Sequence, residues 1–185
     1  MDESNIRSVV QHCIMNAGGY YYHPMDIPYK GAQERAKPDV FSLSIRPTVV
    51  IEVKKVFVRK TKHDTIDGLF EFKKIEDNQR MLLDSLLAID VPVFMAIGSI
   101  LKTEGKNDRM GSIVVIPWEE YLTWENSVDG ISAHWSEILE RWNSQKLDVK
   151  NEMFIEGTKA YLACKTDTKP FEWLTLSRRF DVREE

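Results

Sequence analysis

A β-branched apolar run near residue 50 is the feature that most constrains how this 185-residue chain can fold. Residues 49–53 are Val, Val, Ile, Glu and Val, which is typical of a buried strand, but Glu52 interrupts the run and Lys54 follows it. Side chains two positions apart on a strand share a face, so the acid and the amine lie together. Burying both is costly unless they are paired or hold a metal ion. The run therefore predicts a buried strand that carries a polar site.

A second acid precedes this strand. Asp39 follows Pro38 and opens a segment of alternating apolar residues. Proline fits at a strand edge, where its missing N–H costs no ladder hydrogen bond. We expect strands at 39–45 and 48–56 to pair as a hairpin, which would place Asp39 and Glu52 on adjacent strands.

Asp39, Glu52 and Lys54 together suit one chemistry. Two carboxylates on adjacent strands are the hard oxygen ligands that Mg²⁺ prefers, with Mn²⁺ as the alternative ion. Lys54 could orient or help deprotonate a bound water, or stabilise charge on a phosphate under attack. We therefore predict a site for metal-dependent phosphodiester hydrolysis. The alternative is a structural ion pair, which is less favoured because buried pairs stabilise poorly and the further acid would have no structural role.

The remaining pattern predicts an α/β fold with one domain. Helical spacing indicates helices at 3–17, 75–89 and 131–143 and a short one from Pro117, and apolar runs indicate strands at 20–23, 91–97 and 113–116. We expect a central mixed sheet of about five strands flanked by helices. We expect residues 57–74 to form a basic, partly ordered loop. Residues 1–125 would be the core and residues 126–185 a C-terminal extension packed on it, with the tryptophans from Trp118 onward in the core rather than stacked on bases.

The charge of the chain is unevenly distributed. The net charge of −4 argues against non-specific binding of nucleic acid, yet residues 30–74 contain 11 Lys or Arg against 6 Asp or Glu. Residues 117–185 contain 9 against 14, so the positive part of the chain surrounds the predicted site. This distribution is expected if a polyanion approaches that site. The alternative is that these cations only solvate a loop. The expected DNA phosphate contacts are Lys55, Arg59, Lys60, Lys62, Lys73 and Lys74.

Cysteine usage and hydropathy indicate a cytoplasmic compartment. Cys13 and Cys164 form no CxxC or Cys/His metal spacing, which favours a reducing environment and argues against a structural zinc. No apolar run approaches the roughly 20 residues of a membrane helix, and the start Met-Asp-Glu is unlike a secretory signal.

The spacing Pro38-Asp39, twelve residues, Glu52-Val53-Lys54 resembles the PD-(D/E)XK nuclease superfamily. This resemblance implies a restriction-endonuclease-like core with the order α-β-β-β-α-β. It implies that Asp39, Glu52 and the main-chain carbonyl of Val53 are metal ligands and that Lys54 is the catalytic lysine. It also implies an acid from the first helix, for which Glu3 is the candidate and Gln11 the alternative.

Within that superfamily, residues 70–83 and 115–121 resemble segments of bacterial and phage Holliday junction resolvases, which also carry a glutamine early in the helix after the motif. Gln79 is that glutamine, although it could instead bond only to backbone. The resemblance implies a cytoplasmic, homodimeric endodeoxyribonuclease acting on branched DNA. The alternatives are a restriction- or repair-type nuclease on duplex DNA, a nucleic-acid-binding module without cleavage, and a protein-binding subunit of a larger complex.

Overall fold

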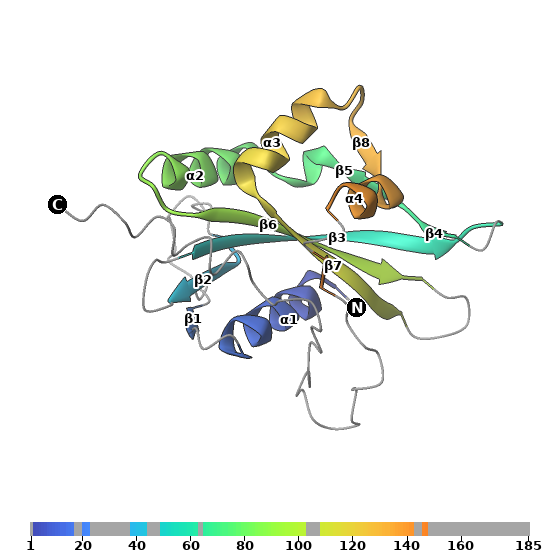
Figure 1. The fold of residues 1–185 in the computed structure, drawn as a ribbon, viewed down its shortest axis with the longest axis horizontal. Coiled ribbons are helices and arrows are strands. Elements are labelled where there is room, and N and C mark those ends of the chain that lie inside the picture. Colours follow the sequence, from blue (N-terminus) through green and yellow to red (C-terminus); the bar gives the residue numbers. More distant parts are fainter. Residues whose placement is uncertain are drawn as a thin grey trace, which may run out of the picture.

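The structure is a computed structural model that describes residues 2–16, 20–22, 38–43, 49–62, 65–102, 108–142 and 146–147. A mixed sheet lies between two helical layers (Figure 1). Helix α1 (Glu3–Asn16) covers one face, while α2 (Asp77–Leu87), α3 (Trp118–Ser127) and α4 (Trp135–Arg141) lie on the other. The protein is therefore a mixed α/β fold, as the sequence pattern predicts.

Strand β3 is the central element of the sheet. The strand order is β1-β2-β3-β6-β7-β9, and β4 also pairs with β3. Strands β3 and β6 are parallel, and the other pairs are antiparallel. The strands of this sheet are β1 (Tyr20–Tyr22), β2 (Val40–Leu43), β3 (Val49–Lys60), β4 (Ile66–Asp67), β6 (Val93–Leu101), β7 (Arg109–Pro117) and β9 (Lys146–Leu147). A separate ribbon joins β5 (Leu69–Glu71) to β8 (Ser132–His134), and the 3₁₀ helix η1 (Phe72–Lys74) follows β5.

The alternation of side chains along β3 builds two apolar cores. Val56 and Val58 join a cluster with Trp118 and the other aromatic residues of the α3 and α4 layer. Ile51 and Val53 point the other way and join a cluster with the apolar side of α1. Because the strand is covered on both faces, a charged residue near its middle is buried unless it reaches an edge.

Helix α1 lies directly on the sheet at Gly98 in β6. A Cβ atom at Gly98 would lie 2.6 Å from the Ile6 side chain, so the absence of a side chain permits this close approach. The register pairs Gly98 with Lys55 of β3. The first turns of α1 therefore cover the sheet as far as Lys55.

Most of the predicted elements are confirmed. The structure contains the first helix, the strand at 20–22, the antiparallel pair of β2 and β3, the second helix and the strands β6 and β7. The order through β6 is helix, three strands, helix and strand, with β4, β5 and η1 inserted before the second helix. The hairpin connection at 44–48 and the tail at 150–185 lie outside the described residues.

Two predictions of local structure are wrong. Residues 57–74 do not form a loop, because β3 continues to Lys60 and is followed by β4, β5 and η1. Val58 is buried and the end of β3 pairs with β4, which supports an extended strand despite its charges. The expected helix at 131–143 begins only at Trp135, because residues 132–134 pair with β5 instead.

The described part of the expected C-terminal extension belongs to the main core. Ile138 of α4 and Trp142 pack in the same cluster as Trp118. The core position of the four described tryptophans is confirmed, since each is at most 5% exposed. None of the helices in the described ranges is both long and apolar enough to cross a membrane.

Candidate active site

The candidate site lies at one edge of β3, between the parts of that edge that pair with β2 and with β4. Strand β2 pairs with residues 49–51, and β4 pairs with residues 59–60, so the middle of β3 pairs with no strand of the described residues on that side. Asp39, just before β2, occupies the start of this gap, where its Oδ2 accepts a hydrogen bond of 2.8 Å from the Val53 backbone N–H. The N–H and C=O of one strand residue point to the same side, which places the Val53 carbonyl on the edge that Asp39 lines.

Glu52, Lys54 and Gln79 form a compact polar triangle on the α2 face of β3. Lys54 Nζ donates to Glu52 Oε1 at 2.7 Å and to Gln79 Oε1 at 3.1 Å. Gln79 Nε2 donates to the same Glu52 oxygen at 2.7 Å. Gln79 also caps the start of α2, because its Oε1 accepts a hydrogen bond of 3.2 Å from the Glu76 backbone N–H. The structure thus brings together the motif residues and Gln79, the glutamine that the resemblance to resolvases indicates.

One oxygen of this triangle lacks a partner. Glu52 is 1% exposed, and its Oε2 makes no hydrogen bond with any described group, although the Asp39 backbone N–H is near enough to lower the pKa slightly. Burial and, after it, the charge of Asp39 raise the pKa of Glu52 from 4.5 to about 7 against the opposing effect of Lys54. Burial therefore makes the ionised form of Glu52 costly in the protein alone, even with Lys54 beside it.

Arg7 is a site residue that sequence reasoning missed. Its Nη1 lies 3.0 Å from Asp39 Oδ1, so α1 reaches the site through a cation rather than through the predicted acid. Glu3 lies instead near Lys74, whose pKa its charge raises against the lowering by burial. Gln11, the alternative from α1, stands one turn beyond Arg7. No sequence signal separates Arg7 from an ordinary solvated arginine, because its partner is 32 residues away.

The residues present suit a small hard cation. Nowhere in the described ranges do three or more His, Cys, Asp or Glu side chains gather closely enough to share a metal ion. The donor set is instead two carboxylates, Asp39 and Glu52, whose charges act on each other, together with the Val53 carbonyl on the same edge. Mg²⁺ is commonly held by one or two carboxylates with water and substrate phosphate in the other positions. The unpartnered Glu52 Oε2 is the observation that fits such an ion.

The predicted phosphate contacts lie on β3 past the site, just after β3 and on η1. Lys55 and Arg59 continue β3 past the site, and Arg59 is exposed. Lys74 reaches the same edge from η1, where its Nζ donates to the Lys55 carbonyl at 3.3 Å. Lys73 is exposed and pairs with Glu71 at 3.1 Å. Lys60 and Lys62 are exposed towards the far end of β3.

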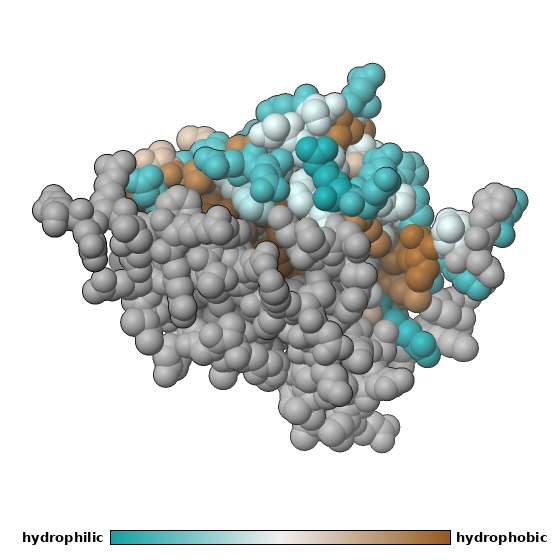
Figure 2. Space-filling model, viewed as in Figure 1, coloured by the Kyte–Doolittle hydropathy of each residue, from teal (hydrophilic) through white to brown (hydrophobic). Residues whose placement is uncertain are grey.

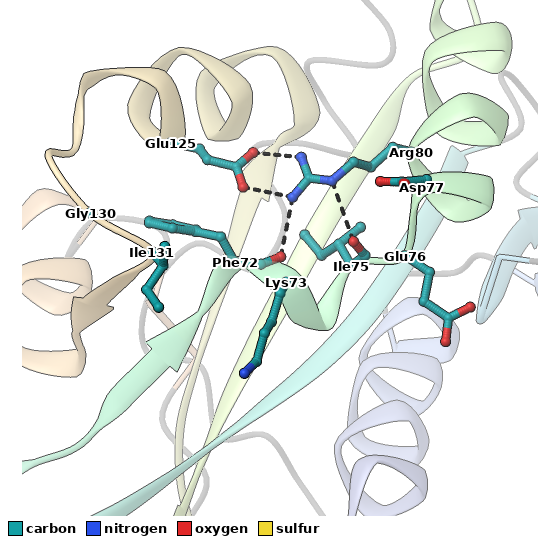
Figure 3. A pocket seen from close by; sticks show the side chains of 9 residues that line it. All are labelled: Phe72, Lys73, Ile75, Glu76, Asp77, Arg80, Glu125, Gly130 and Ile131. Atoms are coloured by element: carbon teal, nitrogen blue, oxygen red, sulfur yellow. Dashed lines mark hydrogen bonds and ion pairs between the residues drawn. The ribbon is translucent and has the colours of Figure 1, made fainter.

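A separate pocket of about 550 Å³ opens between η1, α2 and the end of α3 (Figure 3). Glu125 forms a two-point ion pair with Arg80 there, with both contacts at 2.6 Å. Arg80 also donates to the carbonyls of Phe72 and Ile75, so its donors are already engaged in holding η1 and α2 together. The lining does not include Asp39 or the triangle: it consists of Phe72, Lys73, Ile75, Glu76, Asp77, Arg80, Glu125, Gly130 and Ile131. The contacts of Arg80 in the wall of the pocket hold α2 in position. The pocket itself is not the candidate site.

Comparison with known proteins gives no further support. The chain matches no family model and no curated protein.

Proposed function

We propose that this protein is a Mg²⁺-dependent endodeoxyribonuclease with a restriction-endonuclease-like core of the PD-(D/E)XK type. The observation that carries the proposal is the buried Glu52 carboxylate, which has one oxygen on Lys54 and Gln79 and the other without a hydrogen-bond partner among the described residues. The neighbouring Asp39 supplies the second carboxylate at the same edge of β3. The element order from α1 to β6 also agrees with that core.

Each residue of the site has a separate role in the proposed hydrolysis. Asp39, Glu52 and the Val53 carbonyl would hold the ion, which supplies Lewis-acid stabilisation of the phosphate charge when bound. Lys54 has three N–H donors, and described residues use two of them, which leaves one for a phosphate oxygen or the attacking water. The water oxygen bonds to phosphorus as the ester P–O bond breaks; the water loses one proton and the leaving oxygen gains one.

Gln79 is a positioning residue in this scheme. It contacts both Glu52 and Lys54 and is itself fixed to the first turn of α2. These contacts hold the lysine ammonium beside the carboxylate before the substrate arrives. Preorganised charge of this kind needs no rearrangement during the reaction.

The substrate class proposed is branched DNA, as in Holliday junction resolvases, with a homodimer supplying one site for each strand cut. This choice rests on the resemblance of residues 70–83 and 115–121. The exposed cations along β3 and η1 suit a phosphate backbone, whereas phosphate contacts do not identify the branch structure. A restriction- or repair-type nuclease would use the same site.

A cleavage assay tests the proposal. Native protein, Glu52→Ala and Lys54→Ala are compared on a four-way junction, a duplex and a single strand with Mg²⁺, Mn²⁺ or chelator. Arg141→Ala, which removes an exposed cation of α4, is the matched control. We expect native and control protein to cut with metal only, and both site variants to lose at least a hundredfold in rate. Unchanged cleavage by both site variants would refute the site, and salt-sensitive binding without cleavage by native protein would favour a binding module.

A further inference from the structure

The outer surface of the layer formed by α2, α3 and α4 is acidic. Residues 76–90 contain four Asp or Glu against one Arg, and residues 118–141 contain six against one, with no Lys in either range. Figure 2 shows this layer at the top of the view as mostly hydrophilic surface with separate apolar areas. Because like charges repel, this side of the molecule favours a cationic partner over a nucleic acid.

The pocket between η1, α2 and the end of α3 lies in this layer and has one apolar side. Phe72 and Ile75 of its lining are buried, whereas Ile131 is 76% exposed, the highest exposure of any large apolar side chain in the described residues. Figure 3 shows Phe72 and Ile131 on one side of the pocket and Glu76 and Asp77 on the other. Apolar surface that is rimmed by charged groups is typical of a binding site for a partner.

Two carboxylates of the pocket have no cation to pair with. The two cations of the lining, Lys73 and Arg80, each pair with a glutamate already. Glu76 and Asp77 are exposed, and neither forms an ion pair within the described part of the chain. The positive end of the α2 dipole corresponds to about half a unit charge, so it offsets only part of their two negative charges. The pocket therefore joins an apolar side to uncompensated negative charge.

We propose that this pocket docks an arginine side chain from a basic segment of a partner protein. The methylene groups of the arginine pack against the apolar side, and its guanidinium donates to the carboxylates of Glu76 and Asp77. Met81 lies one turn beyond Asp77 along α2 and is 71% exposed, so it can contact an apolar residue beside the arginine. A phosphate or an acidic segment would instead meet two carboxylates that lack a cation.

The size and place of the pocket fit this role. Its volume of about 550 Å³ lies within the range of about 300–1,000 Å³ that is typical of ligand sites, so it can hold one side chain and the backbone that carries it. Its lining includes neither Asp39 nor the Glu52–Lys54–Gln79 triangle. Docking of a protein segment therefore leaves the β3 edge open to DNA, and it does not depend on the proposed nuclease function.

The test measures binding of labelled peptides to the full chain by fluorescence polarisation. The peptides share the sequence Gly-Gly-Leu-X-Leu-Gly-Gly, where X is arginine, lysine, glutamate or citrulline, which has the shape of arginine without its charge. The site variant combines Glu76→Gln with Asp77→Asn, and its glutamine can still accept the backbone N–H that Glu76 caps. The matched control combines Glu119→Gln with Glu140→Gln, which removes two exposed charges from the same layer outside the pocket. Ile131→Ser tests the apolar side.

We expect native protein to bind the arginine peptide at least tenfold more tightly than the citrulline and glutamate peptides, and about threefold more tightly than the lysine peptide. The site variant should bind the arginine peptide at least fivefold more weakly than native protein, and Ile131→Ser at least threefold more weakly. The control should stay within twofold. No binding of the arginine peptide, equal binding of the arginine and citrulline peptides, or equal losses in the site variant and the control would overturn the inference.

A labelled 20-base-pair duplex, with Ca²⁺ replacing Mg²⁺, is the second probe. We expect the site variant to bind it at least as tightly as native protein does, because two negative charges are removed. Weaker binding of the duplex by the site variant would show that this surface meets nucleic acid and would overturn the inference. Neither probe requires cleavage, so a failure of the proposed nuclease function and a failure of docking are observed separately.

Discussion

Two ion pairs meet at the start of α2, and they differ in completeness. Arg80 and Glu125 form a bidentate pair in which both carboxylate oxygens accept a hydrogen bond at 2.6 Å. Lys54 and Glu52 form a more deeply buried pair in which one carboxylate oxygen has no partner among the described residues. Gln79 contacts both members of the second pair and is adjacent in sequence to Arg80, so one helix turn contributes to both pairs.

The difference separates a structural role from a chemical one. A complete bidentate pair joins α2 to α3 and needs nothing further. An incomplete buried pair costs stability in the protein alone, which is reflected in the raised pKa of Glu52. We infer that the Arg80–Glu125 pair holds α2 in place and that the Glu52–Lys54 pair binds a cation and a phosphate.

The largest expected effect is on the cleavage rate, which should depend on the Glu52–Lys54 pair and not on the Arg80–Glu125 pair. Glu52→Gln should lower the cleavage rate by on the order of a thousandfold, because it removes one carboxylate from the ion. Glu125→Gln should keep the rate within about threefold when assayed well below its melting temperature. Single-turnover cleavage of a flapped duplex measures both. Similar losses in the two variants would mean that the completeness of a pair does not indicate its role.

The metal-free protein should lose stability as the pH rises. The pKa of Glu52 is about 7 in the folded protein against 4.5 ordinarily, so between these values the folded state binds more protons than the unfolded state. The free energy of unfolding should therefore fall from about pH 4.5 to above pH 7, by about 3 kcal/mol in total from this group. Urea unfolding in chelator at several pH values measures it. Glu52→Gln should remove this part of the pH dependence, and an unchanged profile in that variant would contradict the assignment.

Arg80→Ala should destabilise the protein by about 2 kcal/mol. It removes a partly buried two-point ion pair and two hydrogen bonds to carbonyls, and it leaves Glu125 without its cation. Arg80→Lys should recover only part of the loss, because an ammonium cannot make the planar two-point contact. Thermal and urea unfolding provide the measurement. A loss below about 0.5 kcal/mol would show that the complete pair does not hold α2.

Arg7→Ala should have the smallest effect on stability, below about 1 kcal/mol, because the Arg7–Asp39 pair is partly exposed. Its effect on cleavage should be several-fold, since the variant frees the Asp39 carboxylate to rotate on its Val53 contact. The stability and cleavage rate of Arg7→Lys should lie between those of native protein and Arg7→Ala. Unfolding and cleavage are measured on the same preparations. A cleavage rate equal to that of native protein would exclude a positioning role for Arg7.

The sequence predicted best what depends on local pattern. The strand at Glu52 and Lys54, its antiparallel partner after Asp39 and the helix that carries Gln79 all follow from periodicity over a few residues. The polar contacts of Arg7 with Asp39 and of Arg80 with Glu125 could not be predicted, because they join residues 32 and 45 positions apart.

Long-range pairing also explains the errors in local structure. The charges of Arg59 and Lys60 made the end of β3 resemble a loop, whereas β4 pairs with them as a strand. Ile131 has helical spacing with Trp135, yet the three residues between them pair with β5, which lies about sixty positions earlier in the chain. Neither partner is visible in the pattern of the segment itself.

Titration with Mn²⁺ in the absence of DNA tests the central claim most directly. Native protein, Glu52→Gln and Glu125→Gln are compared by calorimetry, so that one carboxylate is neutralised in each pair. We predict that native protein and Glu125→Gln bind Mn²⁺ with affinities within twofold of each other, and that Glu52→Gln binds at least tenfold more weakly. Equal binding by native protein and Glu52→Gln would contradict the account, because the unpartnered oxygen of Glu52 would then not be where the cation binds.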